Sequence, residues 1–380
     1  MRSRLAGIEG VRGIAAMGVL GHHVWSYTSN QRGFGIPGLD LFFSHLRLGL
    51  VAFFMLSGFL LYRPFVAAAL AQESRVDLGR YVRSRVLRIV PAYWAALAVV
   101  LALSPRTFDL STIAKNFLFV QSYWNQKEWV IYPGWTLCVE IAFYAVLPLI
   151  GWASYRYAAS RETTWDRAIC CITIPSAFFL LTPLYKIHAF AHGWPTHALP
   201  AYLDQFAVGM VLAVALAVWR DTAWAQSRFF SASLVAAALV IGVGATSLTL
   251  DHPRSYMSSA FGVLLYEPLM AVAFALVLAF ALVGERANTV SRFLTLRPVA
   301  WLGLASYGIY IWHSPIIHAL DATGGLATLA WSLPATVAIS LVFAASSWYG
   351  LERHALALKA SSADRRIAAP PAVPRPAHRS

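Results

Sequence analysis

Apolar stretches long enough to cross a bilayer recur from the N-terminus almost to the end of this chain. A hydrocarbon core of about 30 Å takes about 20 helical residues, and the 380 residues are 58% hydrophobic and only 12% charged. Ten stretches meet this length, at 8–27, 47–70, 88–104, 136–155, 168–185, 199–219, 231–250, 260–284, 299–319 and 326–350. The sequence therefore predicts an all-α polytopic membrane bundle of about ten transmembrane helices.

The first stretch has one feature of a cleaved signal, because Arg2 and Arg4 precede an apolar run. However, Arg12, His22 and His23 interrupt the run, no small-x-small cleavage site follows, and nine more stretches remain. We therefore expect it to stay as a transmembrane helix.

Most of the 30 Lys and Arg residues fall in alternate connections between the stretches. Since cytoplasmic loops of membrane proteins carry the excess of Lys and Arg, this pattern predicts an even number of spans with both termini in the cytoplasm. The net charge of +13 then lies mostly on the inner face, where it suits membrane lipid headgroups or an anionic cytosolic ligand. No nucleic-acid partner is needed to explain it.

Residues 1–355 show no soluble insertion and no internal repeat, so we expect one transmembrane domain. Residues 356–380 are rich in Pro, Ala and Arg, which predicts a disordered basic cytoplasmic tail. We expect no metal and no tightly bound cofactor. The cysteines lack disulfide or metal spacing and are interpreted as small apolar fillers, and three outer histidines as loop residues: Cys138, Cys170 and Cys171, then His188, His192 and His197.

Two polar residues of the first stretch lie on one helix face. Arg12 and His23 are eleven residues apart, about 16 Å along a helix, whereas His22 points elsewhere. Glu9 is spaced to hold the guanidinium of Arg12. A polar ring inside a membrane needs a partner or a task. The simpler interpretation is that Arg12 snorkels and His23 bonds to a neighbouring carbonyl.

Polar groups from two distant stretches reach a similar depth. Glu140 lies about 8 Å below the outer boundary of its span. Ser306, Tyr310 and His313 share one helix face, and His313 lies about 20 Å from the inner boundary, close to the depth of His23. These groups could meet in one buried chamber, or they could make independent structural hydrogen bonds.

The inner end has a basic cluster, "RYVRSRVLRIVPAYW", with Arg80, Arg83, Arg85 and Arg88. Guanidinium groups suit phosphate through paired donors. The alternative is a plain cytoplasmic cap of positive charge.

Several catalytic motifs are not found. The sequence has no P-loop, HExxH or CxxC, and "GLASYG" has the wrong spacing for a G-x-S-x-G elbow, so Ser306 is a poor nucleophile candidate. Ser57 and Gly58, in "FFMLSGFLL", are interpreted as a close helix contact.

At these residues the sequence resembles the integral-membrane acyltransferase-3 family of bacterial glycan O-acetylases and related acyltransferases. The resemblance covers about residues 5–352 and rests on ordered motifs: "IEGVRGIAAMGVLGHH", "FFMLSGFLL", "RSRVLRIVPAYW", "GWTLCVE", "SYGIYIWH" and a closing Glu352. It makes residues 1–355 an acyltransferase domain in the bacterial inner membrane.

The resemblance also implies roles for individual residues. It implies transfer of an acetyl or other short acyl group from cytosolic acyl-CoA, the cosubstrate, to a hydroxyl of a cell-envelope glycan. CoA phosphates would bind at Arg12, Arg83, Arg85 and Arg88. His23 would act as general base, with Glu140 orienting its ring. Substrate would contact four further residues: Glu9, Ser306, Tyr310 and His313.

Three alternatives stay open at this point. The acceptor could be a sugar or other hydroxyl of a macrolide or secondary metabolite. The acyl group could pass through a covalent acyl-histidine. Buried ionisable residues among ten spans are also ordinary in transporters, which catalyse no reaction.

Overall fold

The computed structural model describes residues 2–28, 35–72, 76–124, 128–247, 262–283, 289–324 and 328–358. Within these ranges the secondary structure is helical, with no strand. The all-α prediction is therefore confirmed. Most of the predicted tail 356–380 lies outside the described residues and stays a prediction.

Thirteen α-helices make up the described chain: α1 (Arg2–Thr28), α2 (Pro37–His45), α3 (Gly49–Ala71), α4 (Leu78–Leu103), α5 (Leu110–Phe117), α6 (Trp135–Ala158), α7 (Thr164–His192), α8 (Leu203–Trp219), α9 (Arg228–Ser247), α10 (Glu267–Leu282), α11 (Thr289–Leu294), α12 (Arg297–Ala322) and α13 (Leu329–Ser347). Short 3₁₀ turns lie at η1 (Leu46–Leu48), η2 (Gln121–Tyr123), η4 (Tyr132–Gly134) and η5 (Leu199–Ala201), and π turns at η7 (Gly262–Tyr266) and η8 (Trp348–Glu352).

Each of the ten predicted stretches overlaps one long helix. In the described ranges, seven helical segments are long and apolar enough to cross a membrane: Gly38–Ala71, Leu78–Leu103, Tyr132–Ala158, Thr164–His192, Arg228–Ser247, Leu264–Leu282 and Leu329–Leu358. The apolar α8 is shorter, and α1 and α12 are long but less apolar because they carry the polar residues singled out above. The exact number of spans and the side of each terminus stay predictions.

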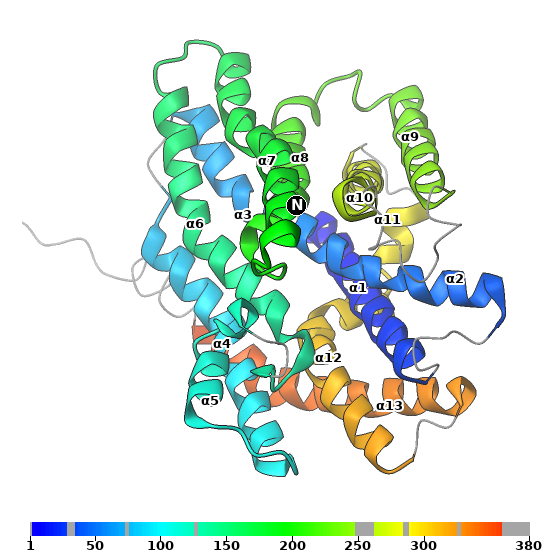
Figure 1. Ribbon diagram of the computed structural model, residues 1–380. Coiled ribbons are helices and arrows are strands. Elements are labelled where there is room, and N and C mark those ends of the chain that lie inside the picture. Colours follow the sequence, from blue (N-terminus) through cyan, green and yellow to red (C-terminus); the bar gives the residue numbers. More distant parts are fainter. Residues whose placement is uncertain are drawn as a thin grey trace, which may run out of the picture.

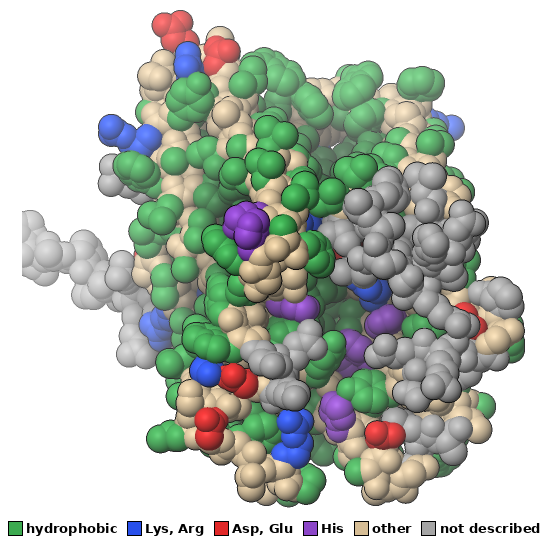
Figure 2. All heavy atoms as spheres, in the orientation of Figure 1, with side chains coloured by type: hydrophobic (Ala, Val, Ile, Leu, Met, Phe, Trp, Pro, Cys, Tyr) green, Lys and Arg blue, Asp and Glu red, His purple; other side chains and the backbone are tan. Residues whose placement is uncertain are grey.

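Apolar side chains cover much of the face shown in Figure 2. Leu180 on α7, Phe229 on α9 and Val240 on α9 are 71%, 82% and 73% exposed. Such surfaces are costly in water but match lipid tails. The arrangement is that of a multi-pass membrane protein.

Glycines let the central helices touch through their backbones. α1 packs along α12, and α3 packs along α8 (Figure 1). A Cβ at Gly303 would lie 2.0 Å from the carbonyl oxygen of Glu9, and one at Gly209 would lie 1.9 Å from that of Met55. A Cβ at Gly58 would similarly lie 2.1 Å from the carbonyl oxygen of Phe206, which confirms the helix contact predicted there.

Two smaller predictions have different outcomes. The three cysteines are free and buried, as expected for apolar fillers. His188 and His192, however, are not loop residues, because α7 continues seven residues past the predicted end of its span and includes both. Their rings stack 4.1 Å apart, one helical turn from each other.

Candidate active site

His23 meets His313 in the interior of the bundle. Nδ1 of His23 lies 2.9 Å from Nε2 of His313, and the two rings stack with centroids 5.0 Å apart. His313 is fully buried on α12, whereas His23 keeps part of its surface accessible. The structure thus joins two of the predicted site residues across 290 positions of sequence.

The backbone sets the tautomers of this histidine pair. Nδ1 of His313 lies 3.1 Å from the carbonyl oxygen of Ile309, which can only accept a hydrogen bond. A neutral His313 therefore carries its proton on Nδ1 and accepts at Nε2. His23 must then donate from Nδ1, which leaves Nε2 of His23 as a lone pair. That nitrogen is in the state a general base requires.

His22 is held away from the pair by a different contact. Its Nδ1 donates to the carbonyl of Phe43 on α2, at 3.1 Å. The sequence-based choice of His23 over His22 is consistent with this arrangement, since His22 and His23 bond to different elements.

Glu140 does not orient the His23 ring as expected. Its Oε1 accepts a hydrogen bond from Ser57 of α3 at 2.8 Å and another from the Tyr144 hydroxyl. His313, and not Glu140, contacts Nδ1 of His23. Depth along each helix places Glu140 and His23 in the interior. It does not specify the direction in which each helix face points.

The partners of Glu140 form a polar stripe that the sequence analysis missed. Thr136, Glu140 and Tyr144 follow one another at intervals of four on α6, so they share one helix face. The signal was present in the sequence. Thr and Tyr hydroxyls are uncharged, however, so their spacing marks a polar site less clearly than a buried carboxylate does.

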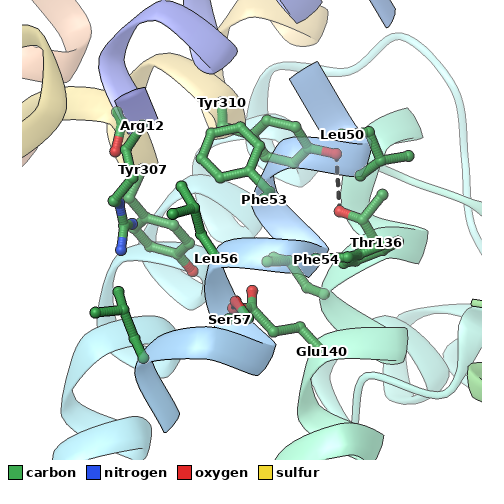
Figure 3. Close-up of a pocket in the computed structure, with 13 residues that line it drawn as sticks. Arg12, Leu50, Phe53, Phe54, Leu56, Ser57, Thr136, Glu140, Tyr307 and Tyr310 are labelled. Carbon is green, nitrogen blue, oxygen red and sulfur yellow. Dashed lines mark hydrogen bonds between the residues drawn. The ribbon is translucent and has the colours of Figure 1, made fainter. Parts of the chain in front are cut away.

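A narrow cavity of about 60 Å³ separates Arg12 from Glu140. Figure 3 shows the two side chains reaching toward the same space from α1 and α6, with Phe53 and Leu56 of α3 between the helices. Ser306 and Tyr310 also line it. The cavity therefore gathers predicted site residues from three distant parts of the chain.

Two of these lining residues are fixed by hydrogen bonds. The Thr136 hydroxyl donates to the carbonyl of Pro133 at 2.9 Å, so the Tyr310 hydroxyl, 2.8 Å from Thr136, is the donor in that pair (Figure 3). The Ser306 hydroxyl donates to the carbonyl of Gly303, one turn back in α12. Among the described residues, the hydrogen bond recorded for the Ser306 side chain is this one, and its interpretation as a poor nucleophile candidate stays a prediction.

Two guanidinium groups and two carboxylates gather at the other end of the cavity. The charge of Arg12 interacts with that of Arg88 on α4, and the carboxylate of Glu352 interacts with both guanidinium groups. Glu9 approaches Arg12 only to 3.9 Å, too far for a hydrogen bond. Among the described residues, Nε of Arg12 and Nη2 of Arg88 are buried without a hydrogen-bond partner. Two close guanidinium groups with unused donors form a place for an anion.

The four arginines of α4 do not act as one cluster. Arg88 turns inward, and Arg85 lies over the ring of Tyr144, with 5.8 Å between the guanidinium carbon and the centroid. Arg83 is exposed and donates to the carbonyl of Leu358, while Arg80 is exposed near Asp77. The structure thus separates two inward arginines from two outer ones.

The Acyl_transf_3 family model, described as an acyltransferase domain, matches residues 5–350. The chain belongs to the acyltransferase-3 family. No solved structure matches it.

Curated relatives of this acyltransferase-3 chain are named as O-acetyltransferases. It is 24% identical over 337 residues to "Peptidoglycan O-acetyltransferase OatA" of Listeria monocytogenes, covering 83% of this chain and 50% of the relative. It is 23% identical over 345 residues to "O-acetyltransferase OatA" of Staphylococcus aureus (82% and 50%), and 22% identical over 384 residues to "Putative peptidoglycan O-acetyltransferase YrhL" of Bacillus subtilis (92% and 54%). The chain spans about half the length of these relatives.

The acyltransferase-3 motifs converge on the geometry described above. Arg12 and His23 come from the first motif, Arg88 from the third, Glu140 from the fourth, and His313 from the fifth. They supply a lone-pair nitrogen on α1 and unused guanidinium donors on α1 and α4, with a cavity beside α1. A base and preorganised positive charge are parts that acyl transfer can use.

Proposed function

We propose that this protein is a membrane-embedded O-acyltransferase that moves an acetyl or other short acyl group from cytosolic acyl-CoA to a hydroxyl of a cell-envelope glycan. The observation that carries the proposal is the hydrogen-bond series from the Ile309 carbonyl through His313 to His23. It leaves Nε2 of His23 ready to accept a proton. The names of the relatives support the glycan as acceptor class.

The proposed reaction balances with these groups. The acceptor hydroxyl gives its proton to Nε2 of His23 as its oxygen attacks the thioester carbonyl. The resulting imidazolium lies between the ring of His313 and the substrates. When the tetrahedral intermediate collapses, the carbon–sulfur bond breaks and the departing CoA sulfur takes the proton back from His23. His313 holds the ring and its tautomer throughout, so it is a positioning residue.

The binding site proposed for the donor uses one arginine of α1 and one of α4. Arg12 and Arg88 have unused donors and would bind phosphate of acyl-CoA at the inner end of the cavity. Arg12 lies about 16 Å along α1 from His23, a distance that an extended thioester arm has to cover. Glu140, held by Ser57 and Tyr144, would limit the positive charge along this path.

Replacement of His23 tests the base. We expect His23→Ala to lower acyl transfer from acetyl-CoA to muropeptide acceptors by about 10²- to 10⁴-fold. His22→Ala is the matched control, because His22 bonds to Phe43 instead, and it should keep most of the activity. Mass spectrometry of the products with purified protein in detergent gives the rates. Equal rates for His23→Ala and the wild type would refute the assignment.

A second pair of variants tests the donor. Arg88→Ala should raise the KM for acetyl-CoA about tenfold through loss of a charge-assisted contact. Arg80→Ala, an exposed arginine on the same helix, should leave that KM unchanged. An unchanged KM in Arg88→Ala would remove the proposed phosphate site, and transfer to macrolide but not to muropeptide acceptors would overturn the acceptor class.

A further inference from the structure

A second cavity lies among α7, α8 and α10. It has a volume of about 170 Å³ and is lined by polar and aromatic groups, including Lys186, His197, Tyr202 and Glu267. Lys186 and Glu267 are 6% and 8% exposed. The cavity lies at the end of the bundle where α7 ends and α8 begins, which the positive-inside pattern predicts to be the outer side.

The charges around this cavity cancel in pairs. Arg47 donates to Glu267 at 3.0 Å, and the other oxygen of Glu267 accepts from Gln205 at 2.9 Å. Lys186 pairs with Asp204 at 3.7 Å. The charged groups at this cavity are therefore paired, whereas Arg12 and Arg88 at the inner end have unused donors.

His197 adds a neutral polar group to this wall. Burial lowers the pKa of His197 to about 4, so the ring is uncharged at physiological pH. A neutral imidazole offers one donor and one acceptor. Such mixed, uncharged groups match hydroxyls better than they match phosphate or carboxylate.

Two tryptophan rings pack against His197 and Tyr202, which line the cavity. Trp135 lies 4.6 Å from the His197 ring and 5.4 Å from that of Tyr202, and Trp129 lies 5.1 Å from His197. The Trp129 indole N–H is fixed on the carbonyl of Gln121. Rigid aromatic faces beside a few well-placed polar groups are typical of small-molecule sites.

The same rings lead to the histidine pair. Tyr132 lies 6.1 Å from the ring of His23 and 5.6 Å from Trp129, which in turn contacts His197. A molecule bound against His197 and Tyr202 is thus separated from the base by two aromatic side chains, Trp129 and Tyr132. Its neighbouring units could reach His23 along them.

We propose that this second cavity and its aromatic wall form a subsite for an uncharged sugar ring of the acceptor, next to the unit that receives the acyl group. The assignment rests on the proposed function for its link to His23. It adds that the acceptor is an extended glycan of at least two units, held by ring stacking and neutral hydrogen bonds. In this proposal the inner end of the bundle, at Arg12 and Arg88, binds an anion, and the outer end, at the second cavity, binds a neutral polyol.

Binding of a defined glycan tests this subsite without any turnover. Equilibrium dialysis of the full chain in detergent against the β-1,4-linked tetramer of N-acetylglucosamine gives the Kd. Tyr202→Leu and His197→Ala, which replace two residues that line the cavity, should each weaken binding about tenfold or more. Trp331→Leu replaces a tryptophan that is 64% exposed on α13, an element that contributes no residue to this cavity, and it should bind as the wild type does. Thermal stability in detergent is measured for each variant, and if Tyr202→Leu is unfolded, His197→Ala decides.

The outcomes separate this proposal from the proposed function. Weakened tetramer binding in the variants, with no acyl transfer by the wild type, would support the subsite and refute the enzyme. Normal binding in both variants, or no binding by the wild type, would overturn the subsite even if transfer occurs. Glycerol phosphate should not compete with the tetramer, and competition that is lost in His197→Ala would assign the cavity to an anionic headgroup instead.

Discussion

At the scale of single residues, the site shows how one residue type takes two roles. Nδ1 of His23 contacts a second histidine, whereas Nδ1 of His313 contacts a backbone carbonyl. The carbonyl of Ile309 fixes the tautomer of His313, and His313 in turn fixes that of His23. A neutral ring can thus orient a general base where a carboxylate was expected.

Replacement of His313 tests this positioning role. We expect His313→Ala to lower kcat about 10²-fold with little change in the KM for acetyl-CoA, because the His23 ring loses its fixed tautomer but the donor site is intact. His313→Gln should recover part of the rate, since its amide oxygen can accept from Nδ1 of His23. Steady-state kinetics of both variants provide the measurement. A Gln variant no better than the Ala variant would argue that the ring does more than position.

The sequence predicted the members of the site better than their partners. Periodicity assigns Arg12 and His23 to one face, and depth assigns Glu140 and His313 to the interior, because both follow from helix geometry alone. Which faces meet depends on how each helix is rotated about its axis. That rotation is set by packing across hundreds of residues, so the His23–His313 contact could not be predicted.

At the scale of elements, glycine contacts determine how closely the central helices approach. Gly13 on α1 and Gly303 on α12 lie where a Cβ would come within 2.7 Å and 2.0 Å of the backbone of the other helix. The sequence did predict the long helices, since apolar length is a local signal. It gave no reason to select these two glycines, because a close approach is visible only when both helices are placed.

Substitution at this crossing should separate the helices. Gly303→Ala is expected to destabilise the protein by about 1–3 kcal/mol through overpacking and to lower acyl transfer, because α1 and α12 carry the two histidines. Gly244→Ala, on α9 with open space around it, should be harmless. Thermal unfolding in detergent, followed by activity at low temperature, distinguishes the two. A stable and active Gly303→Ala protein would mean that the crossing is looser than the structure indicates.

At the scale of the whole molecule, the two ends of the bundle differ in charge. The end at Arg12 and Arg88 has unused cationic donors, whereas Arg47 and Lys186 at the other end are paired with carboxylates. This difference follows the positive-inside pattern of the sequence. Under the proposed function, the donor is anionic and cytosolic and the acceptor is neutral and external, and the difference matches both.

Cysteine labelling tests the predicted orientation. The native cysteines are free but buried, so single introduced cysteines report on their own positions. Thr107→Cys, after α4, should react with a membrane-impermeant maleimide in intact cells, whereas Ser160→Cys, after α6, should react only after lysis. Both residues are exposed. The reverse pattern would contradict cytoplasmic termini, and labelling of both in intact cells would contradict a membrane span at α6.

The backbone contact between α1 and α12 has a consequence for how material crosses the membrane. A carrier that works by alternating access rocks one part of its bundle against another around the bound cargo. Two helices that touch without room for a methyl group resist such sliding. Under the proposed function, His23 keeps its place in the bundle while the thioester and the sugar each come to it, and the acyl group crosses by transfer from one to the other.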